Sequence, residues 1–233
     1  MIERALEDLR SGRPILIFDG EGREGETDIV IPSQFASPRM ITKMRMDGGG
    51  LLCVTVRESD ARKLGLFFFD SFFRKIGQPD SRLFYSGDLK YDSDSAFSLP
   101  INHRSTFTGI PDIDRSKTIT EFAHFLGNLQ KYNGTAKDHF VEQFRSPGHV
   151  WILIARDGYF SRRRGHTELS TYLVERSGLI PSASIVEMLS SDGHSLSRDK
   201  AKEYAARESL TFIEGKDIVS AWKHDSRNGY RSL

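Results

Sequence analysis

The most constraining feature of the sequence is the alternation of short apolar runs with segments whose apolar residues recur at helical spacing. Runs of this length without polar alternation predict strands that are buried on both faces. They lie at residues 14–18, 28–32, 51–56, 96–102, 150–155, 184–189 and 211–213. The amphipathic segments predict helices at residues 2–9, 37–46, 58–64, 114–129, 166–176, 197–208 and 216–222.

This alternation contains no low-complexity linker and no internal repeat, and it predicts one compact α/β domain over residues 1–233. The pattern alone does not decide between a parallel and a mixed sheet. Asp157-Gly158 is typical of a hairpin turn and favours a mixed sheet flanked by helices, the α+β class. Residues 66–95 lack a clear period and carry a phenylalanine cluster, which we expect to pack onto the body of the domain; a ligand platform is the alternative.

Composition limits the functional classes. Lys plus Arg number 33 and Asp plus Glu number 32, so no net field favours nucleic acid or an anionic membrane, and we expect neither as a partner. Cys53 is the one cysteine, which excludes an intrachain disulfide and is consistent with the cytoplasm. No apolar run approaches the ~20 residues that span a bilayer. We expect a soluble, cytoplasmic protein.

An acidic segment at residues 18–28 separates two predicted strands. Its side chains repel one another unless solvent, a cation or Arg23 compensates them, and hard cations such as Mg²⁺ prefer oxygen ligands. The five carboxylates are Asp19, Glu21, Glu24, Glu26 and Asp28. A solvated acidic loop is the alternative, but a position between strands favours a binding site.

A basic segment precedes the predicted helix at residues 166–176. Residues 162–164 are three arginines, Gly165 permits close backbone approach, and Thr167 offers a hydroxyl. Because free N–H groups and the helix dipole attract anions, this segment predicts a phosphate site. A basic surface turn capped by Thr167 remains the alternative.

Two histidines and one glutamate are further candidates. His149 and His166 each follow a glycine beside a predicted element, which suggests metal ligation or proton transfer. Glu187 lies inside a predicted strand; it is either at a sheet edge or buried, and burial would raise its pKa and suit acid-base chemistry. Cys53 is most simply a small buried apolar residue.

Taken together, these segments resemble the 3,4-dihydroxy-2-butanone 4-phosphate synthase family. The matching segments follow the family's order and cover almost the whole chain. They are FDGEGREGETDIV at 18–30, GGGLLCV at 48–54, HRSTFTGIPDIDR at 103–115, FRSPGHV at 144–150, RRGHTE at 163–168 and IVEMLSSDG at 185–193. SPGHV and the insertion at 66–95 are most similar to archaeal members; bacterial members usually have arginine where Ser146 stands. The chain is too short for the cyclohydrolase domain fused to some relatives, so we expect a monofunctional protein.

The resemblance implies conversion of D-ribulose 5-phosphate to L-3,4-dihydroxy-2-butanone 4-phosphate and formate in riboflavin biosynthesis. It implies Mg²⁺ as cofactor, with Mn²⁺ as a substitute, and a homodimer with active sites at the subunit interface. Two rivals remain: another metal-dependent sugar-phosphate isomerase or aldolase, and a non-catalytic nucleotide- or RNA-binding relative of the fold.

The same resemblance implies roles for individual residues. Glu24 and His166 match metal ligands, and His149 and Glu187 match positions essential for catalysis. The positions that match substrate contacts are Arg23, Glu24, Asp28, Arg163, Arg164, Gly165, His166, Thr167 and Glu187. Asp19, Glu26 and Cys53 match residues that line the family's site.

Overall fold

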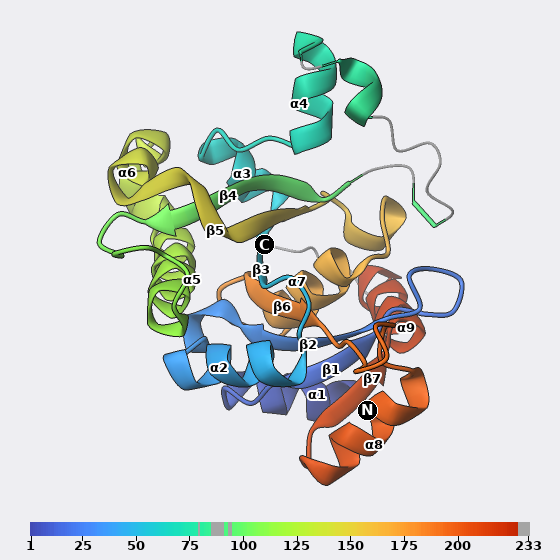
Figure 1. The fold of residues 1–233 in the computed structure, drawn as a ribbon. Helices are drawn as coiled ribbons and strands as arrows, with labels where there is room; N and C mark the ends of the chain where they lie inside the picture. Colours follow the sequence, from blue (N-terminus) through green and yellow to red (C-terminus); the bar gives the residue numbers. More distant parts are fainter. Residues whose placement is uncertain (79, 85–90, 93–94, 228–233) are drawn as a thin grey trace.

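A mixed sheet of seven strands forms the centre of the computed structural model, which describes residues 1–78, 80–84, 91–92 and 95–227 (Figure 1). The strand order is β4-β5-β3-β6-β2-β1-β7. The strands are β1 (Ile15–Phe18), β2 (Thr27–Pro32), β3 (Cys53–Arg57), β4 (Phe97–His103), β5 (Phe144–Ala155), β6 (Ala183–Glu187) and β7 (Thr211–Glu214). Parallel pairs join β3 to β5 and β1 to β7, and the other pairs are antiparallel. The predicted mixed sheet of the α+β class is confirmed.

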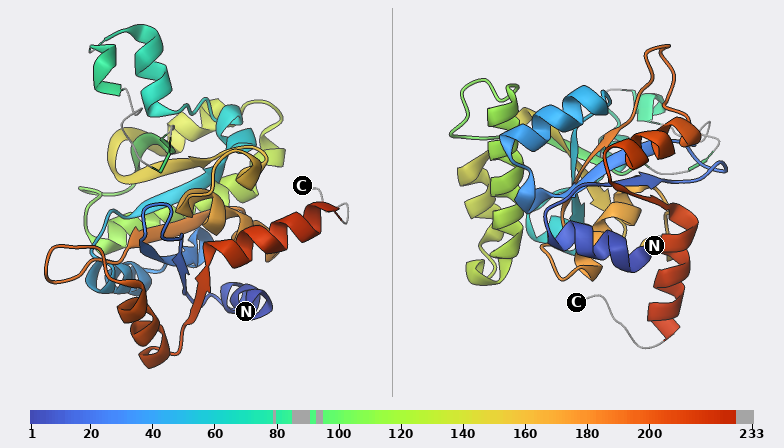
Figure 2. Two further views of the ribbon diagram at one scale, coloured as in Figure 1. Left: turned by 90° about the vertical axis from the view of Figure 1, so that its right-hand side faces the viewer. Right: turned by 90° about the horizontal axis from the view of Figure 1, so that it is seen from below.

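Helices cover both faces of this sheet. They are α1 (Ile2–Arg10), α2 (Pro38–Asp47), α3 (Glu58–Lys63), α4 (Phe69–Ile76), α5 (Asp112–Gly127), α6 (Ala136–Gln143), α7 (His166–Arg176), α8 (Arg198–Arg207) and α9 (Gly215–Arg227). Buried side chains of α2, α5, α6 and α8 join one apolar cluster, and those of α1, α7 and α9 join a second. Figure 2 shows the two groups on opposite sides of the sheet. β1 and β2 are buried along their whole length, because each lies between the two clusters.

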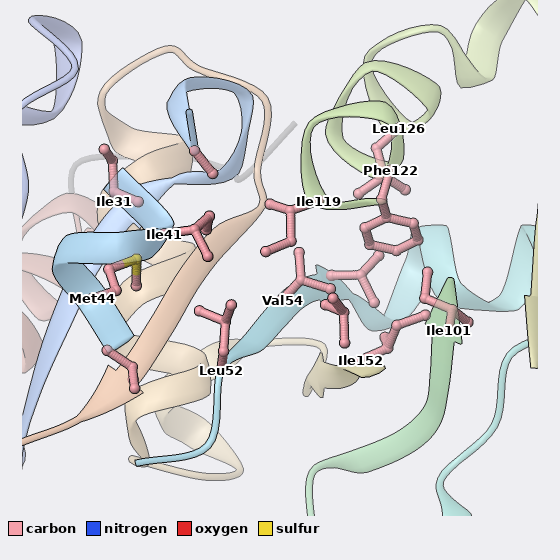
Figure 3. Close-up of a cluster of buried hydrophobic side chains, with 14 of the residues drawn as sticks. Ile31, Ile41, Met44, Leu52, Val54, Ile101, Ile119, Phe122, Leu126 and Ile152 are labelled. Atoms are coloured by element: carbon pink, nitrogen blue, oxygen red, sulfur yellow. The ribbon is translucent and has the colours of Figure 1, made fainter. Parts of the chain in front are cut away.

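The first cluster is a close-packed core between α2, α5 and the sheet (Figure 3). Ile119, Phe122 and Leu126 project from α5 toward Val54 and Ile152 of the sheet. Ile119, Phe122 and Leu126 recur at positions i, i+3 and i+7, so one stripe of the helix meets the strands. This stripe holds α5 against β3 and β5.

Sequence patterns misplaced three features. Asp157-Gly158 does not form a hairpin: β5 runs instead into a short 3₁₀ turn, Tyr159–Ser161, and then into α7, so the antiparallel pairs of the sheet arise elsewhere. β5 begins at Phe144, six residues before the predicted start, because residues 144 and 145 pair with β4. Helix α6 was not predicted, since its apolar residues are too few to show a period.

The excursion at residues 66–95 contains the unpredicted helix α4, which projects from the body of the molecule (Figures 1 and 2). Its rings pack mainly on one another: Phe67 stacks on Phe72 with centroids 4.1 Å apart. Phe69 reaches Trp151 of β5 in an edge contact at 6.1 Å. We expected the phenylalanine cluster to pack onto the body of the domain, and this expectation is met only in part, through contacts such as that of Phe69 with Trp151. Residues 79, 85–90 and 93–94 of the excursion lie outside the described residues.

Within the described part of the chain, no helix combines the length and apolarity that crossing a membrane requires.

Candidate active site

A cavity of about 150 Å³ opens where β2, β6 and the start of α7 meet the loop between β1 and β2. Its walls combine carboxylates, one arginine and one histidine with apolar groups. The lining residues are Glu24, Asp28, Cys53, Tyr91, Asp92, Ser95, Ala96, Phe97, Leu153, Arg163, His166, Thr167, Ile185 and Glu187. Seven of the predicted site residues thus come together from four separate segments of the sequence: Glu24, Asp28, Cys53, Arg163, His166, Thr167 and Glu187.

The acidic loop joins two antiparallel strands, with Phe18 opposite Thr27. Asp19 is buried at its start, and its two carboxylate oxygens accept hydrogen bonds from the backbone N–H groups of Glu24 (3.0 Å) and Glu26 (3.1 Å). These bonds curl the loop so that Glu24 faces the cavity. Glu21, in contrast, is directed to solvent with 84% of its side chain exposed.

Glu26 and Arg23 have partners outside the loop. The carboxylate of Glu26 accepts a 2.5 Å hydrogen bond from the hydroxyl of Ser195. Arg23 pairs with Asp92 at 3.1 Å and lies 3.8 Å from Asp19. Both side chains therefore brace the loop against neighbouring segments.

His166 is held with one ring nitrogen toward Glu24. Nε2 lies 3.2 Å from the backbone carbonyl of Ile17, which can only accept, so Nε2 carries hydrogen and donates. Nδ1 lies 3.5 Å from the nearer carboxylate oxygen of Glu24. A carbonyl partner on one nitrogen is the usual arrangement that orients the other nitrogen toward a metal.

The charges around His166 favour a cation at this position. Burial opposes its protonation, but Asp28, Glu24 and Asp19 outweigh burial and raise the pKa of His166 to about 10. Burial likewise opposes ionisation of Glu24, but His166, Arg163 and Arg23 hold its pKa below the ordinary value.

Asp28 and Glu187 face each other across β2 and β6, where they are direct partners in the antiparallel register. Burial, together with the neighbouring Glu187 and Glu24, raises the pKa of Asp28 well above its ordinary value despite the opposing effect of His166. Oδ1 of Asp28 is buried without a hydrogen-bond partner among the described residues. Such an orphaned carboxylate oxygen is costly unless a ligand or ion satisfies it.

Glu187 is neither on an edge strand nor fully buried. It ends β6, a central strand, and burial raises its pKa. Its Oε2 accepts a 2.7 Å hydrogen bond from the N–H of Leu51. Gly50 makes this approach possible, because a Cβ there would lie 2.2 Å from the same oxygen. Gly50 therefore lets the Glu187 carboxylate approach the backbone of Leu51 closely.

Arg163 and Arg164, adjacent in sequence, enter different cavities. Arg163 lines the cavity of Glu24 and His166 and pairs with Glu168 and Asp92. Arg164 lines a separate cavity of about 410 Å³ between the acidic loop and α9. Gly165 is the N-cap of α7, and His166 and Thr167 are its first residues, so free N–H groups lie beside Arg163.

His149 does not line the cavity in its own chain. It is an exposed residue of β5, and its backbone N–H donates to Asn102 of β4 at 2.9 Å. The ring also faces Asn102, whose amide nitrogen lies 3.1 Å from Nδ1. The chain by itself thus leaves His149 at the surface.

Sequence reasoning missed Tyr91, Asp92 and Ser95, which line the cavity from the excursion at residues 66–95. No local signal marks them, because that segment lacks a period. It also assigned no role to Glu168, which is fully buried although it belongs to the RRGHTE segment.

The donor groups fit a hard divalent cation. One ligand atom each from Asp19, Glu24 and His166 lies within 4.8 Å of the others. Carboxylate oxygens and a neutral imidazole are suitable ligands, and Asp28 adds a buried oxygen that lacks a donor. Asp19 was expected only to line the site; its place in this group was not predicted.

Comparison with known proteins gives one consistent result. A model of the family described as 3,4-dihydroxy-2-butanone 4-phosphate synthase matches residues 3–221. The chain is 42% identical over 226 residues to the synthase of that name from Methanosarcina mazei, covering 95% of this chain and 90% of the relative. It is 43% identical over 225 residues to that of Archaeoglobus fulgidus, covering 95% and 93%.

Two solved structures share the fold. One, described as 3,4-dihydroxy-2-butanone 4-phosphate synthase in complex with two magnesium ions, superposes with a TM-score of 0.75 at 22% identity, covering all of this chain and 99% of the other. The Candida albicans synthase gives a TM-score of 0.73 at 24% identity, covering 94% and 96%.

Proposed function

Because the chain belongs to the 3,4-dihydroxy-2-butanone 4-phosphate synthase family, we propose that it converts D-ribulose 5-phosphate to L-3,4-dihydroxy-2-butanone 4-phosphate and formate, using Mg²⁺, in riboflavin biosynthesis. The observation that carries the proposal is the meeting of Glu24, His166 and Arg163 in one cavity. Donor groups suited to a cation and groups suited to an anion therefore lie side by side, which supports binding of a metal and a sugar phosphate in this cavity.

Glu24 and His166 would hold the cation, and Mn²⁺ would substitute for Mg²⁺. Nδ1 of His166 is the nitrogen directed at Glu24, and Asp19 is the nearest further donor. When bound, such an ion stabilises negative charge that develops on substrate oxygens. The structural relative described with two magnesium ions supports a divalent cation in this fold.

Arg163 and the first turn of α7 would bind the phosphate. The guanidinium lines the cavity, and the N–H groups of residues 165–167 are free of intrahelical partners at the helix start. Arg23 borders the same region through Asp92. Binding the phosphate would also orient the carbon chain toward Asp28 and Glu187. This orientation would lower the activation barrier, in addition to raising the affinity for the substrate.

Asp28 and Glu187 would exchange protons and hydrogen bonds with the sugar. The reaction requires enediol formation, loss of water, a skeletal shift and release of one carbon as formate, and each step moves protons. Burial raises the pKa of both carboxyls above the ordinary value, which suits groups that hold a proton and pass it on. Cys53, beneath them in the cavity wall, supplies apolar surface, and burial raises the pKa of its thiol.

The test is formate release from D-ribulose 5-phosphate in the presence of Mg²⁺. Wild-type protein should release one formate per substrate; an isomerase or aldolase would consume the substrate without formate, and that result would reject the proposal. Glu187→Gln should abolish release while leaving folding and metal binding near normal. His166→Ala should weaken both metal and substrate binding, whereas His139→Ala, a surface histidine paired with Glu142, should change neither.

We also propose a homodimer in which His149 of the partner subunit completes each site. Two observations support it: His149 is exposed outside its own cavity, and apolar side chains are exposed nearby on the surface. Phe107 is 93% exposed and Ile113 is 70% exposed. Arg145 contacts the carbonyl of Phe107 at 3.5 Å, so this apolar surface adjoins the segment that carries His149.

Mixing two inactive variants tests the shared site. His149→Ala and Glu187→Gln homodimers should each be inactive, but heterodimers place both substitutions in one site and leave the other intact. Statistical exchange of subunits should then restore about one quarter of wild-type activity. No recovery after demonstrated subunit exchange would show that each chain uses its own His149.

We propose that residues 1–233 form one domain that acts in the cytoplasm, where phosphorylated sugars are retained by their charge. An activity found only outside the cytoplasm in cell fractionation would contradict this part.

A further inference from the structure

Glu168 is a buried carboxylate to which the proposed mechanism assigns no role. It lies in the first turn of α7, directly before the buried Leu169, and its exposed fraction is 0%. An ionised side chain is rarely buried this deeply unless each oxygen has a partner. Both oxygens of Glu168 do have one.

One oxygen fixes a loop and the other fixes an arginine. Oε1 accepts a 3.1 Å hydrogen bond from the N–H of Arg156, which begins the segment that leads from β5 to α7. Oε2 accepts a 2.9 Å hydrogen bond from Nη1 of Arg163 near the end of that segment. Glu168 therefore ties both ends of the segment to the helix that follows it.

Two further carboxylates lie beside the guanidinium of Arg163, which still lines the cavity. Its Nε lies 2.6 Å from Asp92, its Nη2 lies 3.9 Å from Glu24, and 11% of its side chain is exposed. The guanidinium also lies against Gly165, where a Cβ would be 2.1 Å from Nη1. Asp92 belongs to the excursion and Glu24 to the acidic loop, so Glu168 is the one of these three carboxylates that comes from a core helix.

We propose that Glu168 is a positioning residue that holds the Arg163 guanidinium at the start of α7 for the phosphate of the substrate. The inference rests on the proposed function, because it assigns Arg163 to the phosphate. A planar guanidinium that is bonded through Nη1 to Glu168 and lies against Asp92 through Nε presents its Nη2 N–H groups in a defined direction, which phosphate recognition needs.

Glu168→Gln tests this role because its amide cannot satisfy both partners. Arg156 N–H and Arg163 Nη1–H are both donors, so the amide NH₂ faces a donor in either orientation. Arg163 should leave its position. We expect the dissociation constant for inorganic phosphate, measured by titration calorimetry, and the KM for D-ribulose 5-phosphate to rise together by about 10- to 100-fold, with a smaller change in kcat.

Glu175→Gln is the matched control. Glu175 lies on the same helix, is largely buried, and binds Arg57 at 2.7 Å and Tyr159, in the same β5-to-α7 segment, at 2.6 Å. It should lower stability as Glu168→Gln does, yet leave phosphate binding and KM within about twofold of wild type. An equal loss of phosphate binding in both variants would assign the effect of Glu168 to general stability and overturn the inference.

A double-mutant cycle completes the test. In an Arg163→Ala background, Glu168→Gln should not weaken phosphate binding further, because the two residues act through one group. Additive losses would overturn the inference, as would unchanged phosphate binding in the single variant. If Glu168→Gln does not fold, Glu168→Asp keeps the charge but is one methylene too short for both partners, and the same rise in the phosphate dissociation constant is expected.

Phosphate binding can be measured without turnover. The experiments therefore distinguish a failure of the proposed reaction from a failure of the proposed role of Glu168. Absence of formate from the wild type rejects the reaction but leaves the phosphate titrations decisive for Glu168. Absence of phosphate binding by wild-type protein that does release formate overturns the role of Glu168 alone.

Discussion

Gly165→Ala should impair substrate binding through one added methyl group. The backbone at Gly165 has φ −84° and ψ 173°, a conformation that alanine adopts freely, so backbone strain does not contribute. The obstacle is space: the new Cβ would lie 2.1 Å from Nη1 and 2.6 Å from Cζ of Arg163. Since ordinary contact begins at 3.4 Å, the guanidinium must retreat by at least about 1.3 Å (3.4 minus 2.1).

The displacement of the guanidinium determines how far kcat/KM and the free energy of unfolding should fall. It is large enough to break the 2.9 Å bond to Glu168 and the 2.6 Å contact with Asp92. A misplacement of about 1 Å can cost about 100-fold in rate, so kcat/KM should fall by roughly that factor, chiefly through KM. Leaving Glu168 without its partner should lower the free energy of unfolding by about 1–3 kcal/mol, which a domain of ordinary stability tolerates.

The assay is steady-state formate release, with Mg²⁺ titration and thermal denaturation of the same preparations. Metal affinity should change less than KM, because Gly165→Ala replaces none of the donor groups of Asp19, Glu24 and His166, although Arg163 lies 3.9 Å from Glu24. Gly22→Ala is the control, since Gly22 has an ordinary φ and a Cβ there meets nothing within 4 Å. A folded Gly165→Ala protein with wild-type kcat/KM would refute the claim that Arg163 must lie against this glycine.

Three further predictions concern charge, metal and core. The folded-state pKa of Glu187 is raised by burial, so the wild-type side chain favours folding when protonated and loses that contribution as pH rises through the raised pKa. Glu187→Gln should therefore be more stable than wild type at neutral pH, with the difference vanishing below about pH 4.5 in denaturant titrations; equal stability at every pH would contradict the raised pKa. Chelation with EDTA should abolish formate release, and Mg²⁺ or Mn²⁺ should restore it; activity that persists in EDTA would exclude the metal role of Glu24 and His166. Phe122→Ala removes a fully buried ring of α5 and should cost about 3–5 kcal/mol of unfolding free energy, measured by chemical denaturation, while KM stays unchanged because α5 does not line the cavity.

Much of the local structure followed from the sequence alone. Apolar runs such as residues 14–18 form strands as predicted, because a strand that is buried on both faces carries apolar side chains at every position. The helix predicted at residues 37–46 is α2, and the hydroxyl of Ser37 accepts a hydrogen bond from the Met40 N–H as its N-cap. The acidic loop and the RRGHTE segment were recognised because their charges are concentrated within a few residues.

Tertiary structure alone decided which of these groups meet. Asp28 and Glu187 are 159 positions apart, and only the pairing of β2 with β6 places them opposite each other. Arg163 and Arg164 are neighbours in sequence, yet the turn before α7 sends their side chains into different cavities. Asp92 carries no local signal at all, and only the folded chain places it 2.6 Å from Nε of Arg163.

The physical reason is the range of the interactions. Periodicity, capping and charge density act over a few residues and can be read locally, so the sequence by itself determined the strands, most helices and the chemistry of residues 18–28 and 163–168. Strand order, burial of Glu168 and the exposed position of His149 depend on contacts between segments far apart in the chain, and those contacts exist only once the sheet has assembled.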